Sequence, residues 1–197
     1  MGQRDERMKN QKLLTFVHDL GLLVQRESGE PELLKQGAGL LATLIEHDDW
    51  LPEQFTVSHP EFYRQYLLYA DPQERFSVVS FVWGAGQKTP VHDHMTWGLI
   101  GMLRGQEIDT HYFKQADGSY LRGESHILKP GNVCSVSPAT HDVHEVANFY
   151  PDKTSISIHV YGGNIGRISR HVFDATTGAE KTFISGYNND VVPNLWS

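Results

Sequence analysis

Apolar residues recur at helical spacing near the start of the chain. Between Met8 and Arg26 they fall on one face of an amphipathic helix: Leu13, Leu14, Phe16, Val17, Leu20, Leu22 and Leu23. Gly29 interrupts this pattern, and a second helix is predicted from Pro31 to Ile45, because proline is compatible with the first turn of a helix. A short third helix is predicted over Pro60–Leu68. We expect residues 1–70 to form a helical cap within the same domain as the rest of the chain.

The pattern changes at Phe76, where short runs rich in Val, Ile, Phe, Thr and Tyr begin, separated by Gly, Pro, Asn and Asp. We interpret these runs as strands: Phe76–Trp83, Trp97–Leu103, Gln106–Phe113, Tyr120–Leu128, Val133–Ser137, Val143–Asn148, Thr154–Tyr161, Arg170–Phe173 and Lys181–Ile184. Many short strands at near-even spacing are typical of a β-sandwich or a β-barrel. The predicted fold is therefore mainly β, with a barrel over residues 71–197 and a helical segment before it.

Composition narrows the possible partners. A chain of 197 residues suits one well-packed core. The formal charge of −7 and the lack of a Lys/Arg stripe argue against nucleic acid, and the apolar runs are too short for a membrane span. The N-terminus is polar and a single cysteine, Cys134, excludes an internal disulfide, so a cytoplasmic location is expected. We expect Cys134 to act as a small buried apolar residue in a monomer or small homo-oligomer that binds a small molecule.

Histidine is frequent, with 11 residues, and His92-Asp93-His94 is the most distinctive arrangement. Alternate side chains of a strand share a face, so His92 and His94 can reach one metal ion while Asp93 points away. Either His144 or His141 could supply a third imidazole. The two are three residues apart and would face opposite sides of a strand.

Two stretches resemble the two motifs of the cupins, which form jelly-roll-like β-barrels. The first is Gly86-x-x-x-x-x-His92-x-His94 with Gly105 after it, and the second is Gly131…Pro138…His144-x-x-x-Asn148, with one extra residue between the proline and the histidine. The second motif favours His144 over His141. Gly98 stands where the first motif normally has a glutamate. The resemblance therefore implies a metal held by His92, His94 and His144, with no carboxylate ligand.

Ser157, His159 and Tyr161 alternate with Ile158 and Val160 on a predicted strand. These polar residues either form the outer face of a half-buried strand or point into the barrel as a hydrogen-bonded relay. With the three histidines and Trp83-Gly84-x-Gly86, they resemble the thiol dioxygenases of the cysteine dioxygenase family over about residues 63–173. This resemblance implies an Fe(II) cofactor, O₂ and a small thiol as substrates, and a sulfinic acid as product. It assigns catalytic roles to Ser157, His159 and Tyr161.

The same resemblance bears on which thiol is oxidised. An arginine in a Tyr-x-Arg-Asn-Leu stretch grips the substrate carboxylate in mammalian-type members, and the matching stretch here places Gln65 at that position. This is similar to the bacterial subgroup that prefers 3-mercaptopropionate. We expect Arg170, rather than Arg167, to bind the carboxylate with Gln65. A one-residue shift would place Arg64 there instead and would favour L-cysteine. The family's Cys–Tyr crosslink is not expected, because Gly98 occupies the cysteine position.

Two other classes of protein remain open at this point. A non-redox metal-dependent cupin enzyme would be expected to keep the motif glutamate and has no need for Ser157, His159 and Tyr161. A metal-free cupin that serves as a binding protein would normally lack one or more of the three histidines.

Overall fold

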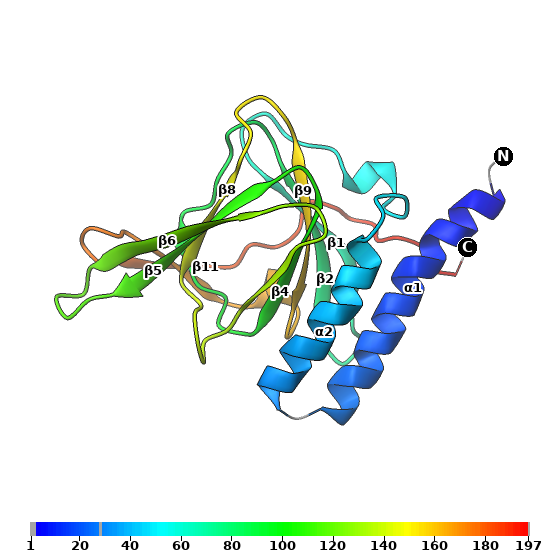
Figure 1. Cartoon of the computed structure of the whole chain (residues 1–197), viewed down its shortest axis with the longest axis horizontal. Helices are drawn as coiled ribbons and strands as arrows, with labels where there is room; N and C mark the ends of the chain where they lie inside the picture. The colour runs from blue at the N-terminus through cyan, green and yellow to red at the C-terminus, as the bar shows by residue number, and fades with distance from the viewer. Residues whose placement is uncertain (1–2, 28, 197) are drawn as a thin grey trace.

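The strands form two antiparallel sheets that face each other (Figure 1). The computed structural model describes residues 3–27 and 29–196. One sheet has the order β1-β2-β9-β4-β7 and the other β11-β10-β3-β8-β5-β6. The strands are β1 (Arg64–Ala70), β2 (Ser77–Trp83), β3 (Val91–His92), β4 (Gly98–Arg104), β5 (Glu107–Lys114), β6 (Tyr120–Leu128), β7 (Val133–Val136), β8 (His144–Asn148), β9 (Ser155–Tyr161), β10 (Arg170–Phe173) and β11 (Glu180–Phe183). This is the mainly β cupin barrel with N-terminal helices that the sequence predicts.

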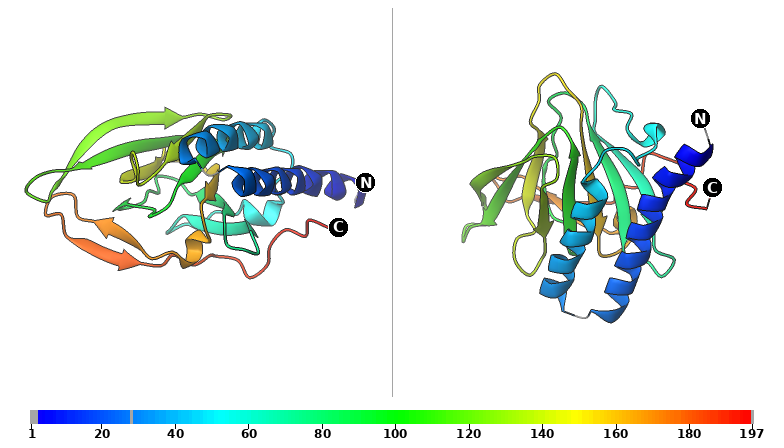
Figure 2. Two further views of the ribbon diagram at one scale, coloured as in Figure 1. Left: turned by 90° about the horizontal axis from the view of Figure 1, so that it is seen from below. Right: turned by 45° about the vertical axis from the view of Figure 1, so that its right-hand side comes forward.

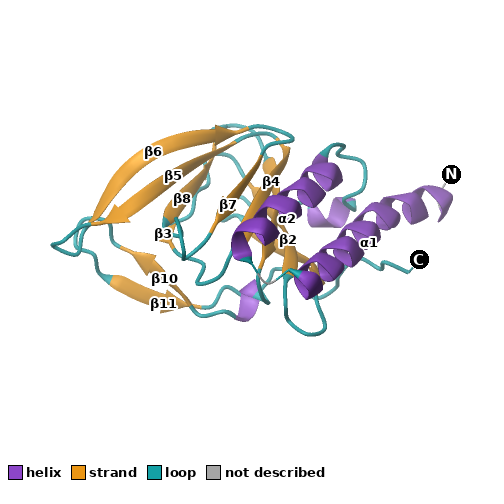
Figure 3. Ribbon diagram, turned by 60° about the horizontal axis from the view of Figure 1, so that its bottom comes forward, coloured by secondary structure: helices purple, strands orange, loops and turns teal. Residues whose placement is uncertain are grey.

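Two helices, α1 (Gln3–Arg26) and α2 (Glu30–Ile45), run side by side along the outer face of the five-stranded sheet (Figures 1 and 2). Both predicted helices are confirmed, although α1 begins at Gln3 rather than Met8. Figure 3 shows the helices on one side of the barrel and the β5–β6 hairpin on the far side. Two 3-10 turns complete the elements, Glu53–Phe55 and Ile165–Arg167. Neither helix has an apolar stretch sufficient to span a bilayer among the residues described.

The central strands β2 and β9 of the five-stranded sheet are buried on both faces, and this positions the functional residues. Every residue of β2 and β9 is buried. On β9, Ile156, Ile158 and Val160 pack with the helices in one apolar core. The alternate residues of β9 therefore face the barrel interior, as strand geometry requires. The predicted period of two is thus correct, and the polar side chains lie inside rather than on an outer surface.

The third predicted helix, Pro60–Leu68, is wrong, because the chain forms β1 there. β1 pairs antiparallel with β2, with Gln65 opposite Phe81. Tyr66 and Leu68 are buried in the core under the helices, while neighbouring residues are partly exposed. This alternation has the period of a strand, and pairing with β2 overrides the helical propensity of the leucines. The chain therefore enters the barrel sheet at Arg64.

The remaining predicted strands are present, with ends that differ by a residue or two. The sequence did not identify β3 as a separate strand, because it has only two residues and follows Pro90. It nevertheless lies between β10 and β8, where His92 is opposite His144. β3 ends at His92, so His94 stands on the loop that follows rather than on the same strand.

Candidate metal centre

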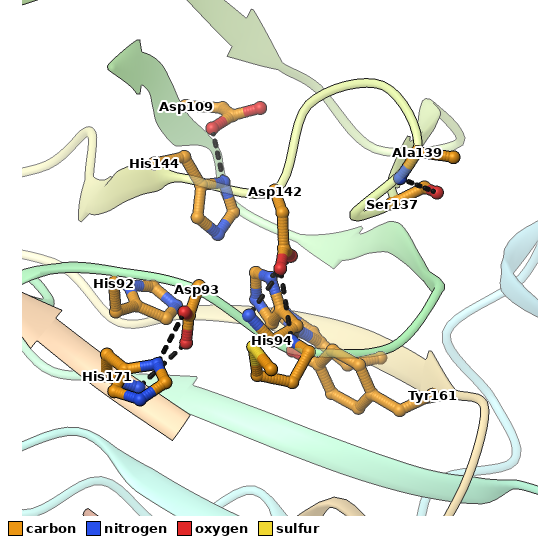
Figure 4. Close-up of polar contacts among 12 residues, drawn as sticks. His92, Asp93, His94, Asp109, Ser137, Ala139, Asp142, His144, Tyr161 and His171 are labelled. Carbon is orange, nitrogen blue, oxygen red and sulfur yellow. Dashed lines mark hydrogen bonds and ion pairs between the residues drawn. The ribbon is translucent and has the colours of Figure 1, made fainter. Parts of the chain in front are cut away.

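His92, His94 and His144 lie close together inside the barrel (Figure 4). Their ligand atoms all lie within 4.8 Å of one another, and the three residues are 8%, 1% and 2% exposed. His141, the alternative third ligand, is exposed, and its ring lies 5.3 Å from that of His111. Among the residues that the structure describes, the three histidines are the one group that could hold a metal ion.

Each of the three imidazoles has an acceptor for its Nδ1 proton. His144 Nδ1 donates to Asp109 Oδ1 at 2.7 Å, and His94 Nδ1 donates to Asp142 Oδ1 at 2.9 Å. His92 Nδ1 lies 3.0 Å from the carbonyl oxygen of Pro90. These bonds fix the tautomer that leaves each Nε2 lone pair free, which is how metal-binding histidines are oriented.

Burial keeps the imidazoles of His92 and His94 neutral. Desolvation, and then the charge of the neighbouring imidazoles, lowers the pKa of His92 and of His94 well below 6.5. Burial raises the pKa of Asp109, but hydrogen bonds from His144 and His111 outweigh it and the pKa is lowered. Three imidazole nitrogen donors supported by two carboxylates fit a divalent first-row metal. The residues present therefore suit a metal-dependent enzyme.

Two aspartates that support the ligand histidines, Asp109 and Asp142, were not predicted from the sequence. Asp142 accepts from the main-chain N–H groups of His94 and Met95 as well as from the His94 ring. It therefore fixes a loop histidine that no strand holds. The one available signal was its position, two residues before His144. Asp93, which was expected to point away from the metal, accepts hydrogen bonds from His171 on β10 (Figure 4).

Ser157, His159 and Tyr161 form the predicted hydrogen-bonded series. Ser157 Oγ lies 2.8 Å from His159 Nε2, and His159 Nδ1 lies 2.8 Å from Tyr161 Oη. Trp83 Nε1 donates to Ser157 Oγ at 3.1 Å, and Phe81 stacks on the His159 ring. The Tyr161 ring lies parallel to the His94 ring at 5.4 Å. The series therefore ends beside the three histidines.

The absence of a side chain at Gly98 leaves room for the Tyr161 ring. The two residues are opposite one another on β4 and β9, and a Cβ at residue 98 would stand 2.9 Å from Tyr161 Cδ1 and from Val136 Cγ2. Contacts this short force the neighbours to move. A side chain at this position, whether glutamate or cysteine, would have to share the space that Tyr161 occupies.

A small cavity opens between the histidines and β1. It has a volume of about 130 Å³ and is lined by Tyr63, Gln65, Phe81, Thr89, Pro90, His92, Tyr161, Arg170, Val172 and Phe183. Gln65 and Arg170 thus both line this cavity. Arg64 points away and donates to the Tyr66 hydroxyl at 2.9 Å, because neighbouring residues of a strand face opposite sides. Arg64 lies on a strand and not, as supposed, on a helix.

Arg170 is a buried cation without an anionic partner among the residues described. It is 3% exposed and stacks over Phe183, and its Nη2 donates to Ser185 Oγ at 2.6 Å. Its Nε and the Oε1 of Gln65 are buried with no hydrogen-bond partner. Burial lowers the pKa of Arg170. Arg167, by contrast, pairs with Glu74 on the surface.

Comparison with known proteins gives one family match and several similar solved structures. The model of the family described as Cysteine dioxygenase type I matches residues 40–174. The structure of the TT1209 protein from Thermus thermophilus has a TM-score of 0.45 and 17% identity, with 56% of this chain and 92% of that chain covered. A cupin superfamily protein from Desulfitobacterium hafniense has a TM-score of 0.44 and 14% identity, with 60% and 94% covered. An oxalate oxidase in complex with glycolate has a TM-score of 0.45 and 14% identity, with 59% and 61% covered.

Proposed function

Because this chain belongs to the cysteine dioxygenase type I family, we propose that it uses Fe(II) and O₂ to oxidise a small thiol carboxylate to its sulfinic acid. The preferred substrate in this proposal is 3-mercaptopropionate, with L-cysteine as the alternative. The observation that carries the proposal is the buried Arg170, whose Nε has no partner, at a cavity that also reaches His92 and Tyr161.

His92, His94 and His144 would hold the iron in this proposal. When bound, Fe(II) would supply the Lewis acidity that favours the thiolate form of the substrate and the redox chemistry that activates O₂. Three neutral ligands leave the full charge of the ion uncompensated, which strengthens its attraction for a thiolate. Both oxygen atoms of O₂ enter the product, R–SH + O₂ → R–SO₂H, so no external reductant is needed.

Arg170 would bind the substrate carboxylate. A buried guanidinium without a counter-ion is costly, and a carboxylate that enters the cavity would remove that cost. The planar guanidinium fork also matches a carboxylate in geometry. Gln65 lies on the same cavity and could donate through its amide. A volume of about 130 Å³ suits a molecule of only a few heavy atoms.

The charge of the cavity favours 3-mercaptopropionate over L-cysteine. Cysteine carries an ammonium group that needs an acceptor when it leaves water. Of the residues lining the cavity in the described part of the chain, none is an aspartate or a glutamate. A substrate that has a thiol and a carboxylate but no amine therefore fits this lining better.

Tyr161 would act as a hydrogen-bond donor at the reacting atoms. It lies on the cavity, and burial raises the pKa of its hydroxyl above the usual value of 10. The hydroxyl thus stays protonated and can donate to substrate or oxygen, and it is not a nucleophile or a base.

The direct test is O₂ consumption by iron-loaded protein given 3-mercaptopropionate, L-cysteine or propionate. We expect uptake with one O₂ per sulfinic acid formed, a higher kcat/KM for 3-mercaptopropionate, and none with propionate, which lacks the thiol. Iron-loaded protein that consumes no O₂ with either thiol would contradict the proposal. A higher kcat/KM for L-cysteine would retain the dioxygenase and overturn the substrate preference.

A further inference from the structure

Glu107 is a buried carboxyl group that the proposed function does not use. It begins β5, is 1% exposed and lies next to Ser157 and Trp83. It makes no ion pair with a lysine or arginine in the part of the chain that the structure describes, and its Oε1 has no hydrogen-bond partner. A buried acid without a cation is costly as a carboxylate and therefore favours its neutral form.

Glu107 extends the polar series inside the barrel to four residues. From the cavity inward, these are Tyr161, His159, Ser157 and Glu107. The first three are joined at 2.8 Å per step, and hydrogen bonding by Ser157 is the largest influence that opposes the effect of burial on the pKa of Glu107. We call these four residues the relay. Its outer end lies beside the three histidines, and its inner end is enclosed by the barrel.

The direction of the hydrogen bonds in the relay depends on one proton. The Ser157 hydroxyl and the neutral His159 ring can each donate only one hydrogen bond along the relay. All the bonds of the relay must therefore be donated in the same direction, either toward Glu107 or toward Tyr161. If Glu107 is a carboxylate, Ser157 donates to it, His159 Nε2–H donates to Ser157, and Tyr161 must donate inward to His159 Nδ1. If Glu107 is a carboxylic acid, it donates to Ser157, Ser157 donates to Nε2, and Nδ1–H donates to the Tyr161 oxygen.

Only the second arrangement frees the Tyr161 proton to point into the cavity. We propose that Glu107 is a positioning residue that stays protonated, selects the Nδ1–H tautomer of His159, and so makes Tyr161 a donor toward the cavity. The proton on Glu107 is not consumed in the reaction. The effect on catalysis rests on the proposed function, whereas the tautomer of His159 does not.

The groups that face Glu107 support its neutral form. Burial, together with the charge of the nearby Asp109 on β5, raises the pKa of Glu107 to about 8, although hydrogen bonds from Ser157 on β9 and Trp83 on β2 act in the opposite direction. Cys134 on β7 and Tyr161 on β9 also sense its charge, and their own pKa values are raised chiefly by burial, so both stay neutral. On β8 the residue opposite is Asn148, and on β6 it is Leu128, neither of which is charged.

The first test needs neither metal nor activity. In metal-free, ¹⁵N-labelled protein, long-range proton–nitrogen NMR reports which ring nitrogen of His159 carries the proton, and the resonance is assigned by its loss in His159→Gln. We expect the Nδ1–H tautomer well below pH 8 and conversion to Nε2–H well above it. Glu107→Gln, which is neutral at every pH and still has donor N–H groups, should keep Nδ1–H throughout.

The second test is the pH–rate profile of the iron-loaded enzyme. In the wild type, the fraction with protonated Glu107 falls about tenfold per pH unit above its pKa, and kcat should fall with it. Glu107→Gln should keep kcat within about twofold at neutral pH and lose this alkaline decline. Glu124→Gln, which removes an exposed carboxyl on β6, should leave the decline in place. Ser157→Ala interrupts the relay, and in that background Glu107→Gln should change nothing.

These outcomes separate the two proposals. An Nε2–H tautomer of His159 at neutral pH, or an alkaline decline that Glu107→Gln leaves unchanged in an active enzyme, would overturn the role of Glu107 while leaving the dioxygenase intact. If the tautomer of His159 changes with pH as expected but the iron-loaded protein consumes no O₂, the role of Glu107 stands and the dioxygenase proposal is overturned.

Discussion

Single side chains at the metal centre act through the hydrogen bonds they make as much as through the groups they present. His94 has no strand to hold it, and Asp142 accepts both its ring Nδ1–H and its main-chain N–H. Carboxylates that orient metal-binding histidines in this way raise the basicity of the ring and fix its direction. Asp142 is therefore expected to matter for metal affinity although it lies outside the ligand set.

Asp142→Ala should weaken metal binding about 10–100-fold, the usual cost of losing such a support. Asp142→Asn keeps one acceptor oxygen and should lose less. Affinity is measured by competition with a chelator, and Asp152→Ala, an exposed loop residue, serves as the control. Equal affinity in Asp142→Ala and the wild type would show that the loop holds His94 without the carboxylate.

Arg170→Gln should raise KM for 3-mercaptopropionate about 10–100-fold, because a hydrogen bond to a charged group contributes about 1.5–3 kcal/mol. Arg167→Gln is the matched control, since Arg167 pairs with Glu74 on the surface. Steady-state kinetics and thermal unfolding of both variants separate lost binding from lost fold. If KM is unchanged in a folded Arg170→Gln protein, the carboxylate binds elsewhere.

Tyr161→Phe should lower kcat about 10–100-fold with KM nearly unchanged, because the lost hydrogen bond acts on the reacting atoms rather than on the carboxylate. The comparison is made at saturating 3-mercaptopropionate. An unaltered kcat together with a greatly raised KM would assign Tyr161 to carboxylate binding instead.

At the scale of elements, α2 packs closely against β4 through glycines. A Cβ on Gly37 would stand 2.9 Å from Leu99 Cδ1, and a Cβ on Gly101 would stand 2.9 Å from Leu41 and Ile45. A glycine is unusual in a helix interior, and at Gly37 it is explained by the close approach of α2 to the sheet.

Two alanine substitutions in α2 test this packing. Gly39→Ala meets no atom within 4 Å and should stabilise the protein by about 0.5–1 kcal/mol through helix propensity. Gly37→Ala offers the same propensity but presses on Leu99, so we expect it to be less stable than Gly39→Ala by about 1–3 kcal/mol. Urea unfolding measures both. Equal stabilities would mean that the leucine moves aside without cost.

The same elements show which parts of the fold and the site can be predicted from sequence patterns and which cannot. Period-two alternation placed β9 and its three polar residues correctly, because one face had to be apolar against the helices. β1 was misread because Tyr66, Leu67 and Leu68 are adjacent apolar residues without clear alternation, and their strand form depends on pairing with β2. Asp109 and Asp142 were missed because they meet their histidines 35 and 48 residues away in the chain. Only the folded barrel brings such pairs together.

At the scale of the whole molecule, the buried ionisable groups give stability an optimum in pH. Between the ordinary pKa of 4.5 and about 8, folded protein keeps a proton on Glu107 that the unfolded chain releases, so its contribution is lost as pH rises. Below 6.5, the unfolded chain takes up protons on His92, His94 and His159 that the folded state does not, so stability falls as pH is lowered.

The metal-free protein should therefore be most stable near pH 6.5, with each group contributing a slope of up to about 1.4 kcal/mol per pH unit. Urea unfolding across a pH series measures this. Glu107→Gln should remove the decline between pH 6.5 and 8 and make the rise between pH 4.5 and 6.5 steeper, because Glu107 opposes the histidines there. Stability that continued to rise through that interval in the wild type would contradict the expected loss from Glu107.

The double-sided burial of β9 also bears on how this protein can change over evolutionary time. Insertion or deletion of one residue before Ser157 would exchange its two faces, placing isoleucines toward the metal and a histidine against the helices. Such a mutation would remove both the stability and the activity of the protein at once, so we expect selection to eliminate it. The turn between β5 and β6 lies at the end of the molecule away from the helices (Figure 3) and can vary in length without shifting the register of β9. Families with this architecture should diversify by lengthening that hairpin while the length of β9 stays constant.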